Sequence, residues 1–415
     1  MTAQFFRRGF TAPRRTCHPL EAVVLIFDSH PVQYKAPVYQ RLQQLRPGTF
    51  KVVYATDSSL RGHHDRDFGQ VVAWDQPLLD GYPHLILHNE RGTPLTGFRS
   101  LTGRGVHNLL QKERPDAVLL SQFSYAFDLA TFLGCVRLNI PLWIRHETQD
   151  EAFVRPAWKQ ALRGLVYHLV YRHIAHAFYI GELNREHLLL HGLTQERLSF
   201  APYASPVCAD VDIPTKQRLR SNIRDGLGIR PDEIILLFSG KLTDKKNPHL
   251  IFDALENLTE AERRCFHVLF AGSGPLEKSL RDRAKQFPGQ VDFAGFINQS
   301  EIPAYYFAAD ILILPSRRAG ETWGLVVNEA LQAGCGAVIT NAVGCHPEFA
   351  DWDRVRVIPE NDAAACANAL RELATYSRSF DWCAERMETY SIKAAAMTIA
   401  EQIDSLSPDS SNAPF

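Results

Sequence analysis

Long apolar runs and paired cysteines are both missing from this sequence of 415 residues. Its eight cysteines are scattered singly, with no CxxC pair and no accompanying pair of histidines. That pattern is typical of reduced thiols rather than of a disulfide framework or a zinc site. No apolar run has the length that spans a bilayer, and the first residues lack the apolar core of a secretory signal. We therefore expect a cytoplasmic protein, and leave open peripheral contact with the inner face of a membrane.

An excess of charge of either sign is also missing. Lysine and arginine together number 45 and aspartate and glutamate 46, so the composition gives no reason to expect nucleic acid as a partner. The first 20 residues depart from this balance, because they carry four arginines and no acid. We predict a disordered basic leader at residues 1–20 and a disordered Ser- and Pro-rich tail at 404–415. A transit peptide or a membrane-touching segment is the alternative for the leader.

Short apolar, β-branched runs alternate with amphipathic stretches of helical length along most of the chain. This alternation predicts parallel sheets covered by helices. It pauses in a looser region after residue 200 and then restarts, as expected for a chain that is too long for one core. The predicted strands are 22–27, 52–55, 85–88, 117–120, 142–144 and 177–180 in the first half, and 233–239, 266–271, 310–315, 337–340 and 355–358 in the second.

We predict an α/β fold with two Rossmann-like domains that face a central cleft. The predicted domains are residues 21–200 and 201–388, and a helix at 389–403 is expected to pack back on the N-terminal domain. Ligands of open α/β sheets bind beyond the carboxyl ends of the strands. The loops that follow the predicted strands are therefore the places to look for chemistry.

The most informative segment follows the strand at 310–315. Glu321 stands before a short turn made of Thr322, Trp323 and Gly324, and a helix pattern that starts at Leu325 carries Glu329. Unpaired N–H groups and the positive end of the dipole make a helix start a ready site for an anion. The alternative is a surface helix with an acidic first turn.

Three further loops follow strands of the same domain. Lys241 and Lys246 follow 233–239 and could clamp a diphosphate as point charges, although a solvated turn explains them as well. Gly272 and Gly274 follow 266–271, where they permit either a close approach of the backbone to a ligand or a tight turn. The third loop presents backbone groups that suit a nucleobase, and its residues are Gly295, Phe296 and Ile297.

The order and combination of these motifs carry more weight than each motif alone. The segments GKLTDKKN, AGSGPL, FAGFINQ, ILPS and ETWGLVVNEALQAG together resemble the C-terminal domain of family 4 nucleotide-sugar glycosyltransferases, which have the GT-B architecture and retain anomeric configuration. Upstream, HPVQYKAPVYQRL and IGELNREHLLLHG resemble a bacterial branch of this family, so the resemblance covers about residues 21–404. The sequence departs from the family at Lys241, where arginine is usual, and at Gly336, where proline is frequent.

The resemblance implies a role for each matched residue. Lys241 and Lys246 would hold the donor diphosphate, Glu321 the sugar hydroxyls and Glu329 the ribose hydroxyls. The backbone of the turn and helix start would hold the β-phosphate, while the loop at 295–297 would face the base. We place Gly272 and Gly274 at the donor site and Trp323 beside the sugar. The residues expected to be catalytic are Glu321, Lys246 and Lys241. The other donor-binding residues are Glu329, Thr322, Trp323, Gly324, Leu325, Gly272, Gly274, Gly295, Phe296 and Ile297.

No metal and no cofactor other than the nucleotide-diphosphate sugar is expected for this chemistry. Acidic triplets occur at 65–67, 210–212 and 351–353, but none follows a predicted strand, and we interpret all three as surface carboxylates.

Polar residues that follow strands of the N-terminal domain are candidates for the acceptor side. His30 and Gln33 follow the first strand, and Arg145, His146 and Glu147 follow the strand at 142–144. Each could position an acceptor hydroxyl or could simply end a strand at the surface. The stretch 158–173 combines apolar residues at helical spacing with basic neighbours. We favour a core-facing helix there over one that rests on an anionic membrane.

The expected function is that of a retaining glycosyltransferase of the hexosyltransferase type. It would move a sugar from a nucleotide donor to a glycan or lipid-linked acceptor, in the biosynthesis of a cell-surface polysaccharide or glycolipid. Two alternatives stay open: a nucleotide-sugar epimerase of the same architecture, and a binding protein without turnover.

Overall fold

The computed structural model describes residues 23–60, 63–65, 70–72, 76–87, 95, 97–209 and 211–406. The predicted leader, residues 407–415 of the predicted tail, and parts of the acidic triplets at 65–67 and 210–212 lie outside the described residues. Within the described residues, no helix is both long enough and apolar enough to cross a bilayer.

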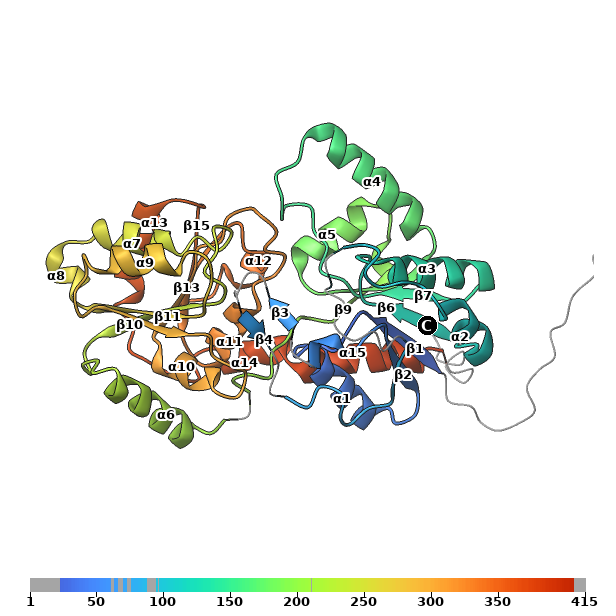
Figure 1. The fold of residues 1–415 in the computed structure, drawn as a ribbon, viewed down its shortest axis with the longest axis horizontal. Helices are drawn as coiled ribbons and strands as arrows, with labels where there is room; N and C mark the ends of the chain where they lie inside the picture. Colours follow the sequence, from blue (N-terminus) through green and yellow to red (C-terminus); the bar gives the residue numbers. More distant parts are fainter. Residues whose placement is uncertain are drawn as a thin grey trace, which may run out of the picture.

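The N-terminal domain is built on a parallel sheet of seven strands (Figure 1). The interior strand β1 is buried at every position, as expected for a strand that is covered on both faces. The sheet order is β5 (His84–Ile86), β2 (Phe50–Tyr54), β1 (Val24–Asp28), β6 (Ala117–Leu120), β7 (Leu142–Ile144), β8 (Ile174–Tyr179) and β9 (Leu198–Phe200). Its helices are α1 (Ala36–Leu45), α2 (Val106–Glu113), α3 (Ala126–Leu138), α4 (Ala157–Tyr171) and α5 (Glu182–Leu190).

The C-terminal domain repeats this plan with a parallel sheet of six strands. The sheet order is β12 (Val291–Gly295), β11 (Phe266–Ala271), β10 (Ile234–Ser239), β13 (Ile311–Leu314), β14 (Gly336–Thr340) and β15 (Val355–Ile358). The helices are α6 (Ile213–Gly226), α7 (His249–Glu256), α8 (Glu260–Arg263), α9 (Glu277–Ala284), α10 (Ile302–Ala308), α11 (Leu325–Gln332), α12 (His346–Phe349), α13 (Ala363–Leu373) and α14 (Ala384–Met387). The last helix, α15 (Ile392–Asp404), belongs to the N-terminal core. Both strand orders are of the doubly wound type, so the predicted fold class is confirmed.

An antiparallel pair of short strands, β3 (His63–Asp65) and β4 (Gln70–Val72), was not predicted. Single turns of 3₁₀ helix are η1 (Ser58–Leu60), η2 (Gln195–Arg197) and η3 (Glu388–Tyr390).

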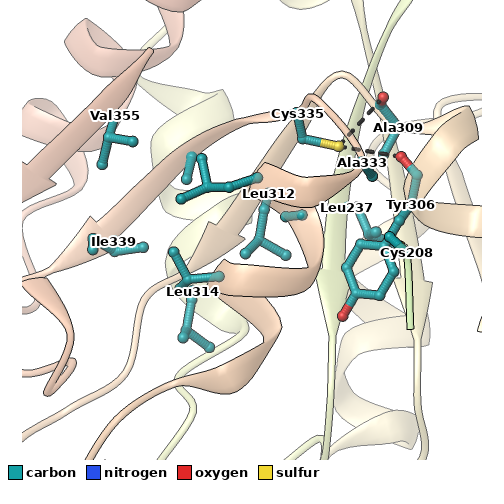
Figure 2. Close-up of a cluster of buried hydrophobic side chains, with 14 of the residues drawn as sticks. Cys208, Leu237, Tyr306, Ala309, Leu312, Leu314, Ala333, Cys335, Ile339 and Val355 are labelled. Carbon is teal, nitrogen blue, oxygen red and sulfur yellow. Dashed lines mark hydrogen bonds between the residues drawn. The ribbon is translucent and has the colours of Figure 1, made fainter. Parts of the chain in front are cut away.

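One face of the C-terminal sheet packs on α10 and α11 through a buried apolar cluster (Figure 2). Leu237, Leu312 and Leu314 of the sheet are fully buried there. The Cys335 thiol donates to the carbonyl of Tyr306 at 3.2 Å, and seven of the cysteines lie among the described residues with free thiols. The Tyr306 ring spans this cluster, and its hydroxyl leaves it toward Glu329.

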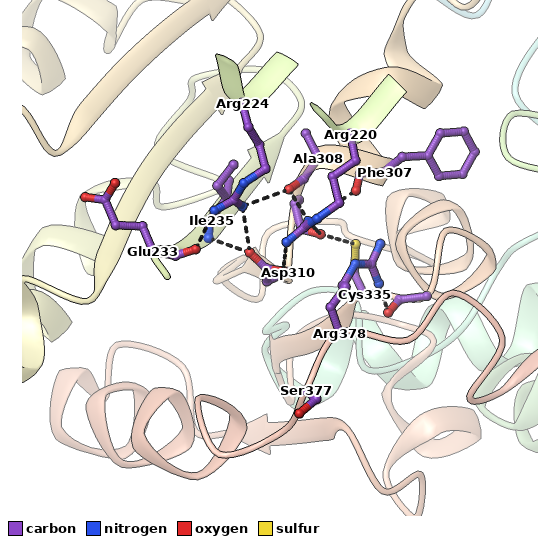
Figure 3. Close-up of polar contacts among 12 residues, drawn as sticks. Arg220, Arg224, Glu233, Ile235, Phe307, Ala308, Asp310, Cys335, Ser377 and Arg378 are labelled. Atoms are coloured by element: carbon purple, nitrogen blue, oxygen red, sulfur yellow. Dashed lines mark hydrogen bonds and ion pairs between the residues drawn. The ribbon is translucent and has the colours of Figure 1, made fainter. Parts of the chain in front are cut away.

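A cluster of arginines lies at the end of the C-terminal sheet where its strands begin (Figure 3). Arg220 donates to the carbonyls of Phe307, Ala308 and Ala309, which end α10, and binds the Asp310 carboxylate at 2.7 Å. Arg224 joins Asp310 at 3.3 Å, and Arg378 donates to the carbonyls of Ala333 and Gly334. These side chains satisfy carbonyls that helix ends leave without partners. A cavity of about 360 Å³ lies at this end of the sheet. Three acidic residues line it (Asp232, Glu233 and Asp310) and so do three arginines (Arg220, Arg354 and Arg378), so its charges give no reason to expect a bound anion.

The chain crosses between the domains after β9 and again at α15. Helix α15 buries Ala395, Ile399 and Ile403 in the core of the N-terminal domain beside α1. Arg46 and Asp404 tie the end of this helix to the end of α1, with an N–O distance of 2.5 Å. The two domains also meet at the cleft, where the Gly320 N–H donates to the carbonyl of Ala152 at 2.7 Å.

Candidate active site

The donor-side residues gather at the point where the order of the C-terminal sheet reverses. Strands β10 and β13 are neighbours in the sheet but not in the chain, and the crevice beyond such a pair is where α/β sheets bind ligands. The loop after β10 carries Lys241 and Lys246, and the loop after β13 carries Glu321.

Lys246 and Glu321 form a largely buried ion pair with an Nζ–Oε2 distance of 2.5 Å. The Ser316 hydroxyl donates to the same carboxylate oxygen at 3.2 Å. Burial raises the pKa of Glu321, but the fields of Lys246 and Lys245 outweigh burial and hold this pKa below its usual value. Glu321 is thus a carboxylate at neutral pH, ready to accept hydrogen bonds from hydroxyl groups.

Lys245 is a third cation of this loop that the sequence analysis passed over. Its ammonium donates to the carbonyl of Gly320 at 2.7 Å and so fixes the loop in front of Glu321. Burial lowers the pKa of Lys245; Glu321 and Glu147 oppose this effect, while Lys246 and Lys241 add to it. One electrostatic neighbourhood therefore contains the two predicted lysines, Glu321 and, from the other domain, Glu147.

Glu329 lies deeper and is held by two hydroxyl groups. Tyr306 donates to Oε2 at 2.6 Å and Ser205 donates to Oε1 at 2.9 Å. Burial raises the pKa of Glu329, although both hydrogen bonds act in the other direction. Neither hydroxyl was predicted, because Tyr306 lies in an apolar helix and Ser205 in the link between the domains.

Helix α11 begins as predicted at Leu325, and no side chain caps its start. Gly324 has a φ of 99°, and a Cβ at this position would lie 2.6 Å from Cγ1 of Val343. The sharp turn needs glycine for both reasons. The first N–H groups of this eight-residue helix therefore keep the donor capacity that an anion requires.

The structure changes the expected role of Trp323. Its indole is only 3% exposed and packs in the core, where Tyr203 lies edge-on with ring centroids 6.0 Å apart. The indole N–H donates to Asn328 at 2.9 Å. The prediction that this ring shapes the sugar pocket is therefore wrong, because the ring faces the protein interior.

Gly272 and Gly274 lie where two loops of the C-terminal domain make close contact. A Cβ on Gly272 would lie 1.9 Å from the carbonyl oxygen of Gly240, and a Cβ on Gly274 would lie 2.6 Å from that of Leu242. These glycines let the turn after β11 press on the loop that carries Lys241. Gly295 ends β12, and Phe296 and Ile297 are partly exposed beyond it.

A pocket of about 300 Å³ opens beside two of the predicted acceptor-side residues. His146 and Glu147 line it together with Thr322, so it joins the N-terminal domain to the donor turn. Burial, and then the charges of His187 and Arg163, lower the pKa of His146 to about 3. His146 is therefore neutral, and both of its ring nitrogens are engaged, with the Thr148 N–H at 3.2 Å and the Tyr171 hydroxyl at 3.1 Å.

The other three acceptor-side candidates do not line this pocket. Arg145 donates to the carbonyls of Ala201 and Pro202 and stacks on Tyr203, which is a structural role. Gln33 lines a separate cavity of about 380 Å³, and the His30 ring is bonded to Ser29 at 2.8 Å. Sequence reasoning missed other pocket residues, namely Ser121, Gln122, Phe123 and Ser124 after β6 and Arg155, Arg163 and Tyr167 near α4.

Asp150 forms the centre of a polar cluster behind this pocket. His187 and His191 lie 2.8 and 3.2 Å from its Oδ2, and Arg163 binds Oδ1. Asp150, His187 and His191 bring three potential metal ligands within 4.8 Å of one another, which the sequence analysis did not predict. Here both histidines hydrogen-bond to the Asp150 carboxylate, which also binds Gln160 and Arg163 on the inner side of α4.

The predicted core-facing orientation of the helix at 158–173 is wrong. In α4 only Tyr171 is buried, and the apolar residues Trp158, Leu162 and Leu165 are exposed.

The residues of this site lie in a part of the chain that matches a known protein family. Residues 220–389 match the family model described as Glycosyl transferases group 1. This range includes all six strands of the second sheet and the loops that carry the lysines and the two glutamates. The C-terminal half of the chain thus carries a domain of that group.

Curated relatives match part of the chain. An uncharacterized glycosyltransferase of Methanocaldococcus jannaschii is 30% identical over 137 residues, which is 32% of this chain and 34% of the relative. D-inositol 3-phosphate glycosyltransferase 2 of Catenulispora acidiphila is 30% identical over 160 residues, which is 36% of this chain and 37% of the relative. The chain matches only about a third of the length of these relatives.

Solved structures extend the likeness to nearly the whole chain. HepE of Anabaena in complex with UDP has a TM-score of 0.62 at 15% identity, over 94% of this chain and 98% of that one. UDP-GlcNAc 2-epimerase of Methanocaldococcus jannaschii has a TM-score of 0.55 at 14% identity, over 92% and 99%. At such identities the likeness establishes the GT-B fold.

Proposed function

We propose, from the Glycosyl transferases group 1 domain at residues 220–389, that the whole chain is a retaining glycosyltransferase of family 4, from a bacterial branch. It transfers a hexosyl group from a nucleotide-diphosphate sugar to a glycan or lipid-linked acceptor in the assembly of a surface polysaccharide or glycolipid. The observation that carries this proposal is the buried pair of Lys246 and Glu321 at the switch point, beside a pocket that reaches the other domain.

The chemistry of the donor explains why these groups are needed. When the bond between the anomeric carbon and the diphosphate breaks, negative charge grows on the leaving group. Lys246, Lys241 and the first N–H groups of α11 are fixed before the reaction, so they stabilise that charge without rearranging. Glu321 accepts hydrogen bonds from the sugar hydroxyls, and Glu329 those of the ribose. These steps need no metal ion.

The acceptor occupies the pocket of His146 and Glu147. Neutral His146 orients the pocket rather than removing a proton, because both of its nitrogens are engaged. The leaving phosphate takes the proton of the acceptor hydroxyl as the new glycosidic bond forms on the same face of the sugar.

A panel of uridine, guanosine and adenosine diphosphate sugars tests this function, with thermal shift and slow donor hydrolysis as the two measurements. The donor with the correct base should raise the melting temperature of the protein, and its slow hydrolysis should release the nucleoside diphosphate. Conversion of the donor into an isomer without release of diphosphate would favour an epimerase, the activity of the structural neighbour described above. Binding of a donor with neither reaction, under every acceptor offered, would favour a binding protein.

A further inference from the structure

Helix α4 turns its apolar side away from the protein. It stands at the outer side of the N-terminal domain (Figure 1), and its large apolar residues recur at helical spacing along one flank. Phe153 and Val154, just before the helix, are exposed as well. We call these seven side chains the α4 surface: Phe153 (46% exposed), Val154 (81%), Trp158 (65%), Leu162 (57%), Leu165 (56%), Val166 (52%) and Leu169 (49%).

The polar cluster at Asp150 fixes this unusual orientation. Gln160 donates to Asp150 at 3.0 Å, and Arg163 binds the same carboxylate from the next turn. The Tyr167 ring lies edge-on to His187, with ring centroids 4.7 Å apart. The polar flank of α4 is thus bonded inward, and the helix cannot roll to bury its apolar flank without breaking these contacts.

Charge indicates what covers the α4 surface. Residues 152–181 contain no aspartate or glutamate. Lys159 of α4 and Arg172, which caps the end of this helix, are exposed. The Lys159 ammonium lies 5.4 Å from the centre of the Trp158 ring. If the α4 surfaces of two copies packed against each other, their basic residues would come close together. The segment 152–181 has no carboxylate that could pair with them. A bilayer with anionic headgroups offers both an apolar layer and the opposite charge.

We propose that the α4 surface seats the protein on a bilayer that contains anionic phospholipids, with α4 in the plane of the interface. Phe153 of this surface also lines the acceptor pocket, as do Arg155, Arg163 and Tyr167 beside it. The pocket therefore opens next to the headgroups, where it takes a lipid-linked acceptor. The choice of acceptor rests on the proposed transferase function, whereas the membrane contact does not.

Vesicle flotation of the full chain tests the contact directly. We expect binding to vesicles of phosphatidylcholine and phosphatidylglycerol in equal parts, and little binding to phosphatidylcholine alone. The double variant Leu162→Glu/Leu165→Glu should lower the bound fraction by about tenfold or more, because two charges enter the apolar flank. The matched control is Ile213→Glu/Met397→Glu, which changes two exposed apolar residues elsewhere and should bind like the parent. The parent and both variants share residues 1–22, so any contribution of that segment to vesicle binding is the same in all three proteins.

Trp158 supplies a second readout that needs no purified acceptor. Its fluorescence should shift to shorter wavelength with anionic vesicles, and the shift should vanish in Trp158→Phe.

Equal vesicle binding by the Leu162/Leu165 variant and its control would overturn the proposal, as would equal binding to both lipid mixtures. Self-association that the variant abolishes, without vesicle binding by the parent, would assign the surface to a second copy instead. Donor hydrolysis without vesicles should survive in the variant, so loss of transferase function and loss of membrane contact are separable.

Discussion

Single residues explain how a donor would be held. Lys246 and Glu321 come from loops after neighbouring strands, and each removes the cost of burying the other's charge. The proximity of the two loops could be predicted, because both follow strands of a doubly wound sheet, but the ion pair itself was not predicted. The roles of Arg145 and Trp323 could not be predicted, since a polar or aromatic residue after a strand has the same sequence signal whether it faces a ligand or the interior.

Replacing Lys246 by alanine should abolish catalysis. The chain should still fold, with a lower free energy of unfolding, because Glu321 loses its closest cation while Lys245 remains nearby. The leaving diphosphate loses a fixed cation, so kcat for donor hydrolysis should fall by about 100-fold or more. Lys278→Ala removes an exposed lysine of α9 and serves as the control, with activity unchanged. Near-normal turnover of Lys246→Ala, with circular dichroism like the parent's, would contradict the assigned role.

Replacing Glu329 by glutamine should weaken donor binding more than it slows the reaction. A neutral amide accepts hydrogen bonds from ribose less well than a carboxylate, so KM for the donor should rise by about tenfold while kcat changes little. Steady-state kinetics with the donor from the panel gives both constants. A fall in kcat at constant KM would place Glu329 at the reacting centre instead.

At the scale of elements, the strand pattern predicted both sheets and most strand positions. It missed β9 and the β3–β4 pair, whose strands are each three residues long. It also could not orient α4. A helix pattern shows that an apolar flank exists, but Asp150, His187 and His191 decide where that flank points, and they lie outside the helix.

The turn after β11 should be intolerant of any side chain. Gly272→Ala places a methyl group against the Gly240 carbonyl, so the free energy of unfolding should fall by about 2 kcal/mol or more. Gly226→Ala is the control, because nothing lies within 4 Å of a Cβ there and alanine suits the end of α6. Chemical denaturation measures both, and equal stability of the two variants would contradict the close contact of the loops.

A buried carboxyl group makes the contact between α12 and α5 sensitive to pH. Burial raises the pKa of Glu348 to about 7, although its carboxylate accepts the Glu182 N–H. A pKa raised by folding favours the folded state at low pH, and this contribution is lost as pH rises from about 4.5 toward 7. Glu348→Gln should therefore raise Tm at pH 8 and leave it nearly unchanged at pH 4. Thermal melts across this range test it, and an increment that does not depend on pH would contradict the shift.

The fold brings residues of the two domains together at one pocket. The C-terminal domain holds the lysines and glutamates, the N-terminal domain holds the pocket of His146 and Glu147, and Thr322 lines that same pocket from the donor side. Two crossings of the chain and the packing of α15 on α1 keep the halves joined. The residues predicted to hold the donor follow strands of one domain, so sequence motifs could bring them together in a prediction. The acceptor half is assembled from segments that only the fold brings together.

The most direct test of the central claim follows the sugar of the donor by time-resolved proton NMR. The donor identified in the panel is incubated with the parent protein and with Lys246→Ala, in the presence of a large excess of a simple alcohol as acceptor. The account predicts that the parent releases nucleoside diphosphate and forms a glycoside with the anomeric configuration of the donor, while Lys246→Ala forms almost none. A product of inverted configuration, or equal rates for the two proteins, would contradict it.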